Sequence, residues 1–194
     1  SVIGTYDLTL NEIDLSTGGS LTIDNTSGGT VTIVAQAGGN RVFNIPAGET
    51  ATLNSIVVQG NGTLAGNGGC ILNDGTLTLN SATVQNCNAT GHGGGIYSDG
   101  SLDLNSSTIQ NNFADDNDGG GVYQVGNLTV IGGSFQNNRA DANGGAIYVT
   151  GNFFTENSPL FGTGTGNTWN FDTLGAGAHC GAVVVAGDGR LSTS

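Results

Sequence analysis

The chain of 194 residues contains 15 acidic residues, three arginines and no lysine, which gives a formal net charge of −12 at pH 7. This charge disfavours nucleic acid as a partner, because proteins bind nucleic acids by neutralising phosphates with lysine and arginine, and it disfavours anionic membrane surfaces for the same reason. No stretch approaches the roughly 18 consecutive apolar residues of a spanning helix, so we expect no membrane insertion.

The N-terminal part of the chain contains short segments in which apolar and polar residues alternate, namely residues 8–10, 21–23 and 31–33. Alternation with a period of two places the apolar side chains on one face of a strand. Farther along, Ile45 lies 26 residues before Ile71, and residues 52–55 lie 26 before the similar residues 78–81 (71 − 45 and 78 − 52). We therefore predict strands in this region and a weak form of a sequence repeat.

A pair of small residues followed by an apolar residue occurs four times between residues 69 and 150. The apolar positions are Ile71, Ile96, Val122 and Ile147, which lie 25, 26 and 25 residues apart. The glycines of the repeat are Gly69, Gly94, Gly95, Gly120, Gly121 and Gly145. A fixed interval of this length indicates a stack of similar units, none of which buries its own hydrophobic face.

Each repeat contains three predicted strands, three turns and no pattern typical of a helix. A strand rises about 3.3 Å per residue, so a repeat of this length suits one circuit of a flattened coil better than a hairpin. Coils stacked about 4.8 Å apart place equivalent residues above one another. We therefore expect Leu77, Leu102 and Leu128 to form an internal stack, and Asn112 and Asn138 to form an asparagine ladder at a turn. The prediction is an all-β parallel β-helix, with one solenoid domain over residues 1–170.

The repeat ends after residue 148, and an aromatic region that includes Trp169 and Phe171 follows it. An apolar run over residues 178–186 then reads as a strand. We expect residues 171–194 to be either a C-terminal cap over the last coil or a strand segment that pairs with a neighbouring molecule. In the second case the assembly interface would comprise Val183, Val184, Val185, Trp169 and Phe171. Head-to-tail repetition of such a contact would give a fibre.

The Gly-Gly-x-Ile segments, together with the apolar-x-x-Asn motifs of residues 109–112 and 135–138, resemble the repeats of polymorphic outer-membrane proteins and of related bacterial extracellular β-helix proteins. The resemblance covers about residues 41–150 and departs from the pattern at Cys87, which stands where asparagine is expected. It implies a right-handed, single-stranded β-helix, export to the cell surface or the extracellular medium, a structural or adhesive role, and no catalytic residues. Partners would be further copies of the chain or components of cell surfaces and extracellular matrix.

The chain has three cysteines, Cys70, Cys87 and Cys180, so at least one has no partner within the chain. Cys70 and Cys87 could meet within one coil and form a disulfide. Packed free thiols are the alternative, because the spacing fits no metal-site pattern.

The most acidic segment is residues 115–118, which include Asp115, Asp116 and Asp118, and Asp141 lies one repeat after Asp115 (141 − 115 = 26). Stacked carboxylates can bind Ca²⁺, the one cofactor that this chain suggests, although a solvated turn explains the same residues. With Arg139 nearby, the segment is also the one place for a polysaccharide lyase-like or sugar-binding site, for which a surface ion pair is the simpler alternative.

A third class of function is suggested by threonines on predicted outward positions. Thr32, Thr52, Thr78 and Thr129 are of the residue type that an ice-binding face repeats, but Asp103 interrupts the series. The leading hypothesis is therefore a non-enzymatic structural or adhesive protein that assembles head to tail. A carbohydrate-active enzyme or sugar-binding module, and an ice-binding protein, are the alternatives.

Overall fold

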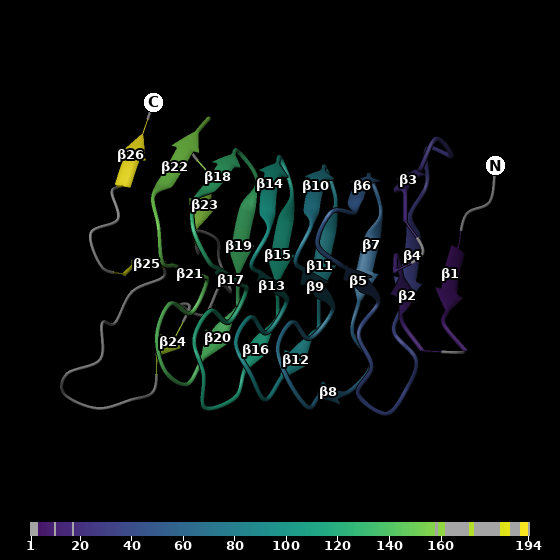
Figure 1. Ribbon diagram of the computed structural model, residues 1–194, viewed down its shortest axis with the longest axis horizontal. Helices are drawn as coiled ribbons and strands as arrows, with labels where there is room; N and C mark the ends of the chain where they lie inside the picture. The colour runs from purple at the N-terminus through teal and green to yellow at the C-terminus, as the bar shows by residue number, and fades with distance from the viewer. Residues whose placement is uncertain are drawn as a thin grey trace.

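The structure is a computed structural model that describes residues 4–9, 11–16, 18–157, 159–161, 171–172, 183–186 and 191–193. These residues form short strands and no helix, so none of them belongs to a helical segment that could cross a membrane. The strands stack along one axis, as Figure 1 shows, and neighbouring strands are paired in parallel. The chain is thus an all-β parallel β-solenoid, as the repeat predicts.

Four sheets surround the axis, and we number them in the order in which each coil passes through them. Sheet I comprises β3 (Ser20–Asp24), β6 (Thr50–Asn54), β10 (Thr76–Asn80), β14 (Ser101–Asn105), β18 (Leu128–Ile131), β22 (Phe153–Glu156) and β26 (Leu191–Thr193). Sheet II comprises β1 (Gly4–Asp7), β4 (Val31–Val34), β7 (Val57–Gln59), β11 (Thr83–Gln85), β15 (Thr108–Gln110), β19 (Ser134–Gln136) and β23 (Leu160–Phe161).

The other two sheets complete each circuit. Sheet III comprises β8 (Thr63–Leu64), β12 (Asn88–Ala89), β16 (Phe113–Ala114), β20 (Arg139–Ala140) and β24 (Phe171–Asp172). Sheet IV comprises β2 (Ile13–Asp14), β5 (Phe43–Ile45), β9 (Ile71–Asn73), β13 (Ile96–Ser98), β17 (Val122–Gln124), β21 (Ile147–Val149) and β25 (Val183–Val185). Strand β1 and strand β26 lie at opposite ends of the stack (Figure 1).

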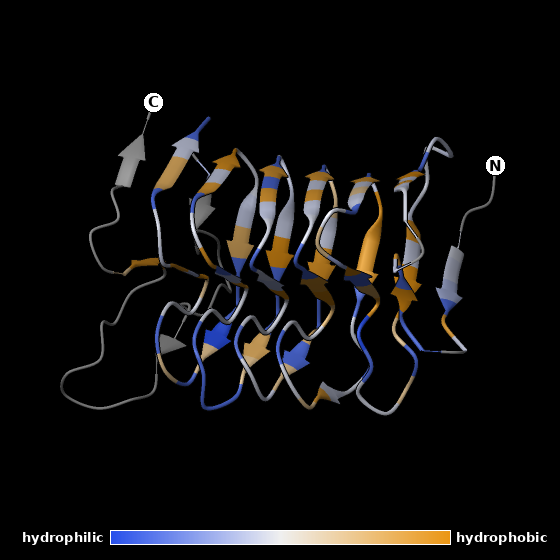
Figure 2. Ribbon diagram, viewed as in Figure 1, coloured by the Kyte–Doolittle hydropathy of each residue, from blue (hydrophilic) through white to orange (hydrophobic). Residues whose placement is uncertain are grey.

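The inward side chains form one hydrophobic core that runs along the whole stack. Phe43, Phe135 and Phe153 are its largest buried members, and the predicted internal stack of leucines belongs to it. In Figure 2 the hydrophobic colour recurs in bands along successive strands, with paler or hydrophilic colour between the bands. Each coil therefore buries its apolar face only because it has neighbours, as expected of a solenoid.

The predicted interval of the repeat is confirmed by the strand register. One inward column of sheet IV consists of Phe43, Ile71, Ile96, Val122 and Ile147. The predicted alignment of Ile45 with Ile71 is wrong, because this coil has 28 residues (71 − 43) rather than 26. The shift by two residues keeps Ile45 on the inward face, where it is fully buried, since side chains alternate with a period of two.

Each central coil contains a fourth strand where the sequence pattern predicts only a turn. These are the strands of sheet III, and they are two residues long. Ala89, Ala114 and Ala140 point inward from them and are fully buried. Two residues are too few to show an alternation, so the sequence carries no signal for this sheet; it exists because stacked backbones pair once the longer strands are in register.

The corners of the coils have left-handed backbone conformations that recur from coil to coil. Between sheets I and II the corner residues are Ser55, Ser81 and Ser106, with φ of 55°, 50° and 51°. Between sheets II and III they are Asn86, Asn111 and Asn137, with φ of 56°, 55° and 53°. The conformation costs a residue other than glycine about 1–2 kcal/mol, and asparagine visits it more readily than most. Paired strands on both sides of each corner offset this cost.

The repeat glycines serve close packing as much as turning. Gly93 has a φ of 70° and makes the corner before sheet IV. Gly94, by contrast, is needed for space, since a Cβ there would lie 2.3 Å from the carbonyl carbon of Phe113 and 2.4 Å from the oxygen of Gly120. Any larger residue at Gly94 would therefore push neighbouring coils apart.

The asparagine ladder lies inside the solenoid. The Oδ1 atom of Asn138 accepts hydrogen bonds from the backbone N–H (3.1 Å) and the side-chain amide (3.0 Å) of Asn112. The Oδ1 atom of Asn112 in turn accepts a hydrogen bond from the backbone N–H of Cys87 at 3.0 Å. The Nδ2 atom of Asn112 donates to the backbone oxygen of Val84 at 3.1 Å. The left-handed turn is made by the residue before each ladder asparagine. Turning and bonding are thus divided between two adjacent asparagines.

Three strands after residue 170 continue the stack. Strands β24, β25 and β26 pair in parallel with β20, β21 and β22 of the same chain, so Val183 lies opposite Ile147. Within the described residues, β25 has a partner on one edge only. An intermolecular contact of Val183–Val185 therefore stays a prediction. Phe171 begins β24, whereas Trp169 and Cys180 lie outside the described residues.

Candidate functional site

The acidic segment lies in the loop after β16. The N–H groups of Asp115 and Asp141 donate to the oxygens of Ala89 (2.9 Å) and Ala114 (3.1 Å), which places the two aspartates in adjacent coils of one column. Oxygen atoms of Asp115, Asp116 and Asp141 lie within 4.8 Å of one another. Three carboxylates at this distance could share a divalent cation, and calcium binding here stays a prediction.

Arg139 is bound within this acidic loop region. Its guanidinium forms an ion pair with Asp141, and its Cζ atom lies 4.4 Å from the centre of the Phe113 ring. The arginine side chain is half exposed. Arg139 and Asp141 thus form a surface ion pair, which the cation–π contact with Phe113 reinforces. The lyase-like role of Asp115 and Arg139 would require this arginine to leave Asp141 for a substrate.

Asp118, the fourth aspartate of the predicted calcium set, lies apart from these carboxylates. Its Oδ1 accepts a hydrogen bond from Nδ2 of Asn143 at 2.7 Å, and its Oδ2 lies 3.6 Å from Nδ1 of His92. The same His92 nitrogen accepts the backbone N–H of Asp118 at 3.3 Å, which leaves Nε2 as the donor of the neutral ring. The three side chains form a loop column beside sheet IV.

A stack of three tyrosines stands on the outer face of sheet IV, next to that column. Tyr97, Tyr123 and Tyr148 lie opposite one another in the strand register. Their ring centres are 5.4 and 5.1 Å apart, with planes inclined by 5° and 8°. The His92 ring packs against Tyr123 at 4.5 Å between centres. We call the three tyrosines the tyrosine ladder.

Burial raises the pKa of each ladder tyrosine above its ordinary value of 10.0. Negative charges add to this effect: Asp99 and Asp74 raise the pKa of the first tyrosine, and Asp118 raises the pKa of Tyr123 and of Tyr148. For Tyr123 the neighbouring tyrosines contribute as well. The three phenols are therefore neutral at ordinary pH and available as hydrogen-bond donors and acceptors.

The ladder hydroxyls make no hydrogen bond to any residue that the structure describes. The sequence contains the signal for this ladder, because a tyrosine follows the apolar residue in three successive repeats, as Tyr97, Tyr123 and Tyr148. Sequence reasoning missed it, since one outward tyrosine is ordinary and only the register stacks three of them.

Cys70 and Cys87 are joined by a disulfide, with 5.4 Å between their Cα atoms. Both residues are fully buried, and the bond crosses the interior of a single coil, from the residue before β9 to the residue before β12. Cys87 occupies the position in its coil that the ladder asparagines Asn112 and Asn138 occupy in the next two coils. The disulfide is therefore part of the scaffold rather than of an exposed reactive site.

The outward threonines of sheet I form a short array. Thr22, Thr52, Thr78, Asp103 and Thr129 lie in one column of the register. Thr32 belongs to sheet II, so its grouping with the other threonines is wrong. An ice-binding face requires long regular ranks of one residue type, and here the aspartate interrupts the column.

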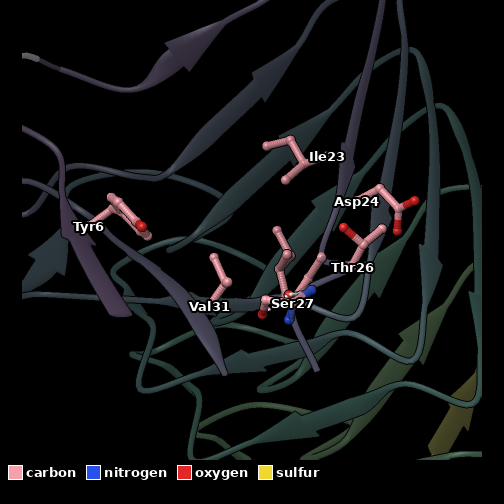
Figure 3. Close-up of a pocket in the computed structure, with 8 residues that line it drawn as sticks. Tyr6, Ile23, Asp24, Thr26, Ser27 and Val31 are labelled. Atoms are coloured by element: carbon pink, nitrogen blue, oxygen red, sulfur yellow. Dashed lines mark hydrogen bonds between the residues drawn. The ribbon is translucent and has the colours of Figure 1, made fainter. Parts of the chain in front are cut away.

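A hollow of about 270 Å³ lies between β1, β3 and β4 (Figure 3). Tyr6, Ile23 and Val31 line its apolar side. On the polar side, the Asn25 oxygen accepts hydrogen bonds from the N–H and hydroxyl of Ser27. These polar groups are engaged within their own turn, so the hollow offers a ligand less than the tyrosine ladder does.

Fold and side-chain columns together define a parallel β-solenoid whose coils stack in register. Within it, residues 132–150 match the family described as the Chlamydia polymorphic membrane protein repeat, which confirms the resemblance over part of one coil. No curated protein and no solved structure matches the chain. The matched family is a repeat found in membrane proteins, and the match covers only this short part of the solenoid.

Proposed function

We propose that this chain is an exported, non-enzymatic solenoid that acts in adhesion at a bacterial cell surface. The observation that carries the proposal is the match of residues 132–150 to a repeat of surface-associated proteins, within a stack of coils that presents the same side chains repeatedly. Repetition favours adhesion, because several weak contacts to one surface combine into strong attachment when their geometry allows simultaneous engagement.

The scaffold supports this role physically. Buried asparagines, a disulfide and a continuous core make the stack rigid, so its outer columns keep a constant spacing. The net charge of −12 favours uncharged or basic surface components over anionic ones. The one cationic group of the acidic loop, Arg139, is engaged by Asp141, which supports a non-enzymatic reading of that loop.

Retention of coated beads tests the proposed function. Beads carrying the purified chain are passed over epithelial cells, extracellular-matrix proteins and cell-wall polysaccharide, with beads carrying an unrelated acidic globular protein as the control. We expect retention above the control on at least one surface; retention equal to the control on every surface contradicts adhesion. Turnover of uronate polysaccharide that Asp115→Ala or Arg139→Ala abolishes would replace the proposal with a lyase-like enzyme.

Head-to-tail assembly is the finer part of the proposal. It would use the edge of Val183–Val185 that has no partner within the described residues. Electron microscopy over a range of protein concentrations tests it, with Val184→Lys as the variant that places a charge on this strand. Fibres that the variant shortens support assembly, and isolated short rods at all concentrations contradict it.

A further inference from the structure

We propose that the tyrosine ladder binds an extended, uncharged polysaccharide that lies along the solenoid axis. The inference rests on the proposed adhesive function, since it names the site and the chemical class of the ligand. It starts from the ladder hydroxyls of Tyr97, Tyr123 and Tyr148, which are at equal places in successive coils and have no partner among the described residues.

The spacing of the ladder favours a sugar polymer over a peptide. The ring centres repeat every 5.1–5.4 Å along the axis. An extended peptide presents side chains to one face only every second residue, about 6.6 Å apart, so it falls out of step with the ladder within two coils. The pyranose units of an extended β-linked polysaccharide follow one another at an interval close to that of the tyrosines, so one sugar can face each coil.

The groups around the ladder suit a ligand rich in hydroxyls. Each phenol can donate one hydrogen bond and accept others. The neighbouring loop column adds a carboxylate from Asp118, a side-chain amide from Asn143 and the Nε2–H of His92. Sugar hydroxyls both donate and accept, and this site offers both kinds of partner beside apolar ring surface, as ligand sites commonly do.

Charge decides against an anionic polysaccharide. Asp74, Asp99 and Asp118 lie close enough to the ladder to act on its hydroxyls electrostatically. No lysine exists in the chain, and the structure places no arginine in contact with the ladder within the described residues. Uronates and sialylated glycans would therefore be repelled, whereas a neutral glycan is not.

The scaffold itself does not require tyrosine in this column. Leu72 holds the place before Tyr97, and Val184 holds the place after Tyr148, in the same register. Aliphatic residues thus satisfy the outer face of sheet IV in flanking coils. Stacking of the coils therefore does not require three successive tyrosines beside a column of polar loop side chains.

Titration calorimetry with neutral oligosaccharides tests the site. The probes are the extended, β-1,4-linked cellohexaose and N-acetylchitohexaose, with polygalacturonate as the anionic comparison and a lysine-rich peptide as the competing class of ligand. The variants are Tyr123→Leu, which copies Leu72, and Tyr123→Phe, which removes only the hydroxyl. Gln85→Leu, on the outer face of sheet II, is the matched control. Circular dichroism and thermal unfolding establish that each variant is folded.

We expect at least one neutral hexasaccharide to bind the wild-type chain, about tenfold more weakly after Tyr123→Leu because a ring contact and a hydrogen bond are lost. Tyr123→Phe should weaken binding less, and Gln85→Leu should leave it unchanged. The inference is overturned if no neutral probe binds, if Tyr123→Leu binds as wild type, or if the ladder binds only the peptide. Beads coated with the Tyr123→Leu variant separate the two proposals. If these beads adhere as well as wild-type beads, the proposed role of the tyrosine ladder is contradicted but adhesion is not. If wild-type beads do not adhere, the proposed adhesive function is contradicted.

Discussion

The asparagine ladder and the tyrosine ladder are built by the same register but differ in what they leave unsatisfied. Inside the solenoid, Asn112 and Asn138 use their amides on each other and on the neighbouring backbone. On the outer face of sheet IV, three tyrosine rings stack while their hydroxyls bond to no described residue. The first ladder therefore stabilises the stack, and the second has hydrogen-bonding capacity left for a ligand.

The comparison separates repetition that serves folding from repetition that serves recognition. A buried polar group must be satisfied within the protein, because leaving it unpaired costs the full desolvation free energy. An exposed hydroxyl has water as its default partner and can exchange it for a ligand. Substitutions in the two ladders should therefore affect different measurements.

The largest effect should follow removal of an amide from the inner ladder. Asn112→Ala would leave the buried N–H of Cys87 without its side-chain partner and would remove the hydrogen bond that Asn112 donates to the buried oxygen of Val84. At about 1–3 kcal/mol for each unpaired group, we expect the free energy of unfolding to fall by about 4 kcal/mol. Urea unfolding followed by circular dichroism measures this change.

The matched control for this substitution is Asn105→Ala. Asn105 belongs to a separate row of asparagines, in which its Nδ2 donates to Oδ1 of Asn80 at 2.9 Å, but this residue is partly exposed. We expect a loss below about 1 kcal/mol, since water replaces the missing amide. Equal losses for the two variants would contradict the distinction between buried amides and amides that water can reach.

The next effect concerns the disulfide at the end of the inner ladder. Removing the Cys70–Cys87 bond frees a loop with a sequence separation of 17 residues, for which we expect a loss of about 3 kcal/mol. Cys70→Ala with Cys87→Asn restores the residue type of the ladder and should lose less than Cys70→Ala with Cys87→Ala. Thermal unfolding compares the two double variants. The same unfolding temperature for both would show that the ladder ends at Asn112.

The outer ladder should show itself in a dependence of stability on alkaline pH. The folded chain holds the pKa of its ladder tyrosines above 10.0, so it binds more protons than the unfolded chain once the pH exceeds that value. The resulting stabilisation is complete below pH 10 and is lost as the pH rises through the raised pKa values. Phenolate absorbance and unfolding temperature, measured together, should show this loss. Tyr123→Phe should reduce this loss of stability at alkaline pH. If the variant and the wild type lose the same stability, burial of Tyr123 does not raise the pKa of its phenol.

The smallest effect is expected in the acidic loop. Asp116→Asn removes one of three carboxylates that lie within 4.8 Å of one another, at an exposed position. Relief of repulsion should stabilise the chain by no more than about 0.5 kcal/mol in calcium-free buffer. Calcium should raise the unfolding temperature of the wild type more than that of the variant. An equal response of both proteins would argue against a calcium site at Asp116.

Much of the fold follows from the interval between the apolar residues of the repeat. That interval predicts the stack, the inward column that contains Leu77, and the ladder of Asn112 and Asn138, because identical coils can bury their faces only on one another. It fails at Ile45, whose coil is two residues longer, and at sheet III, whose strands are too short to show a pattern. Local patterns cannot report a change of coil length that leaves the inward face unchanged.

By itself, the sequence determined the class of architecture and the residues that turn toward its core, since both depend on local alternation and on a fixed interval. Only the tertiary structure decided which outward residues meet. It set Asp118 beside His92 and stacked three tyrosines from separate repeats into one ladder, whereas the interval of the repeat had already placed Asp141 one coil after Asp115. The reason is physical: contacts between coils depend on register to within one residue and on the path of each loop, which no single repeat specifies.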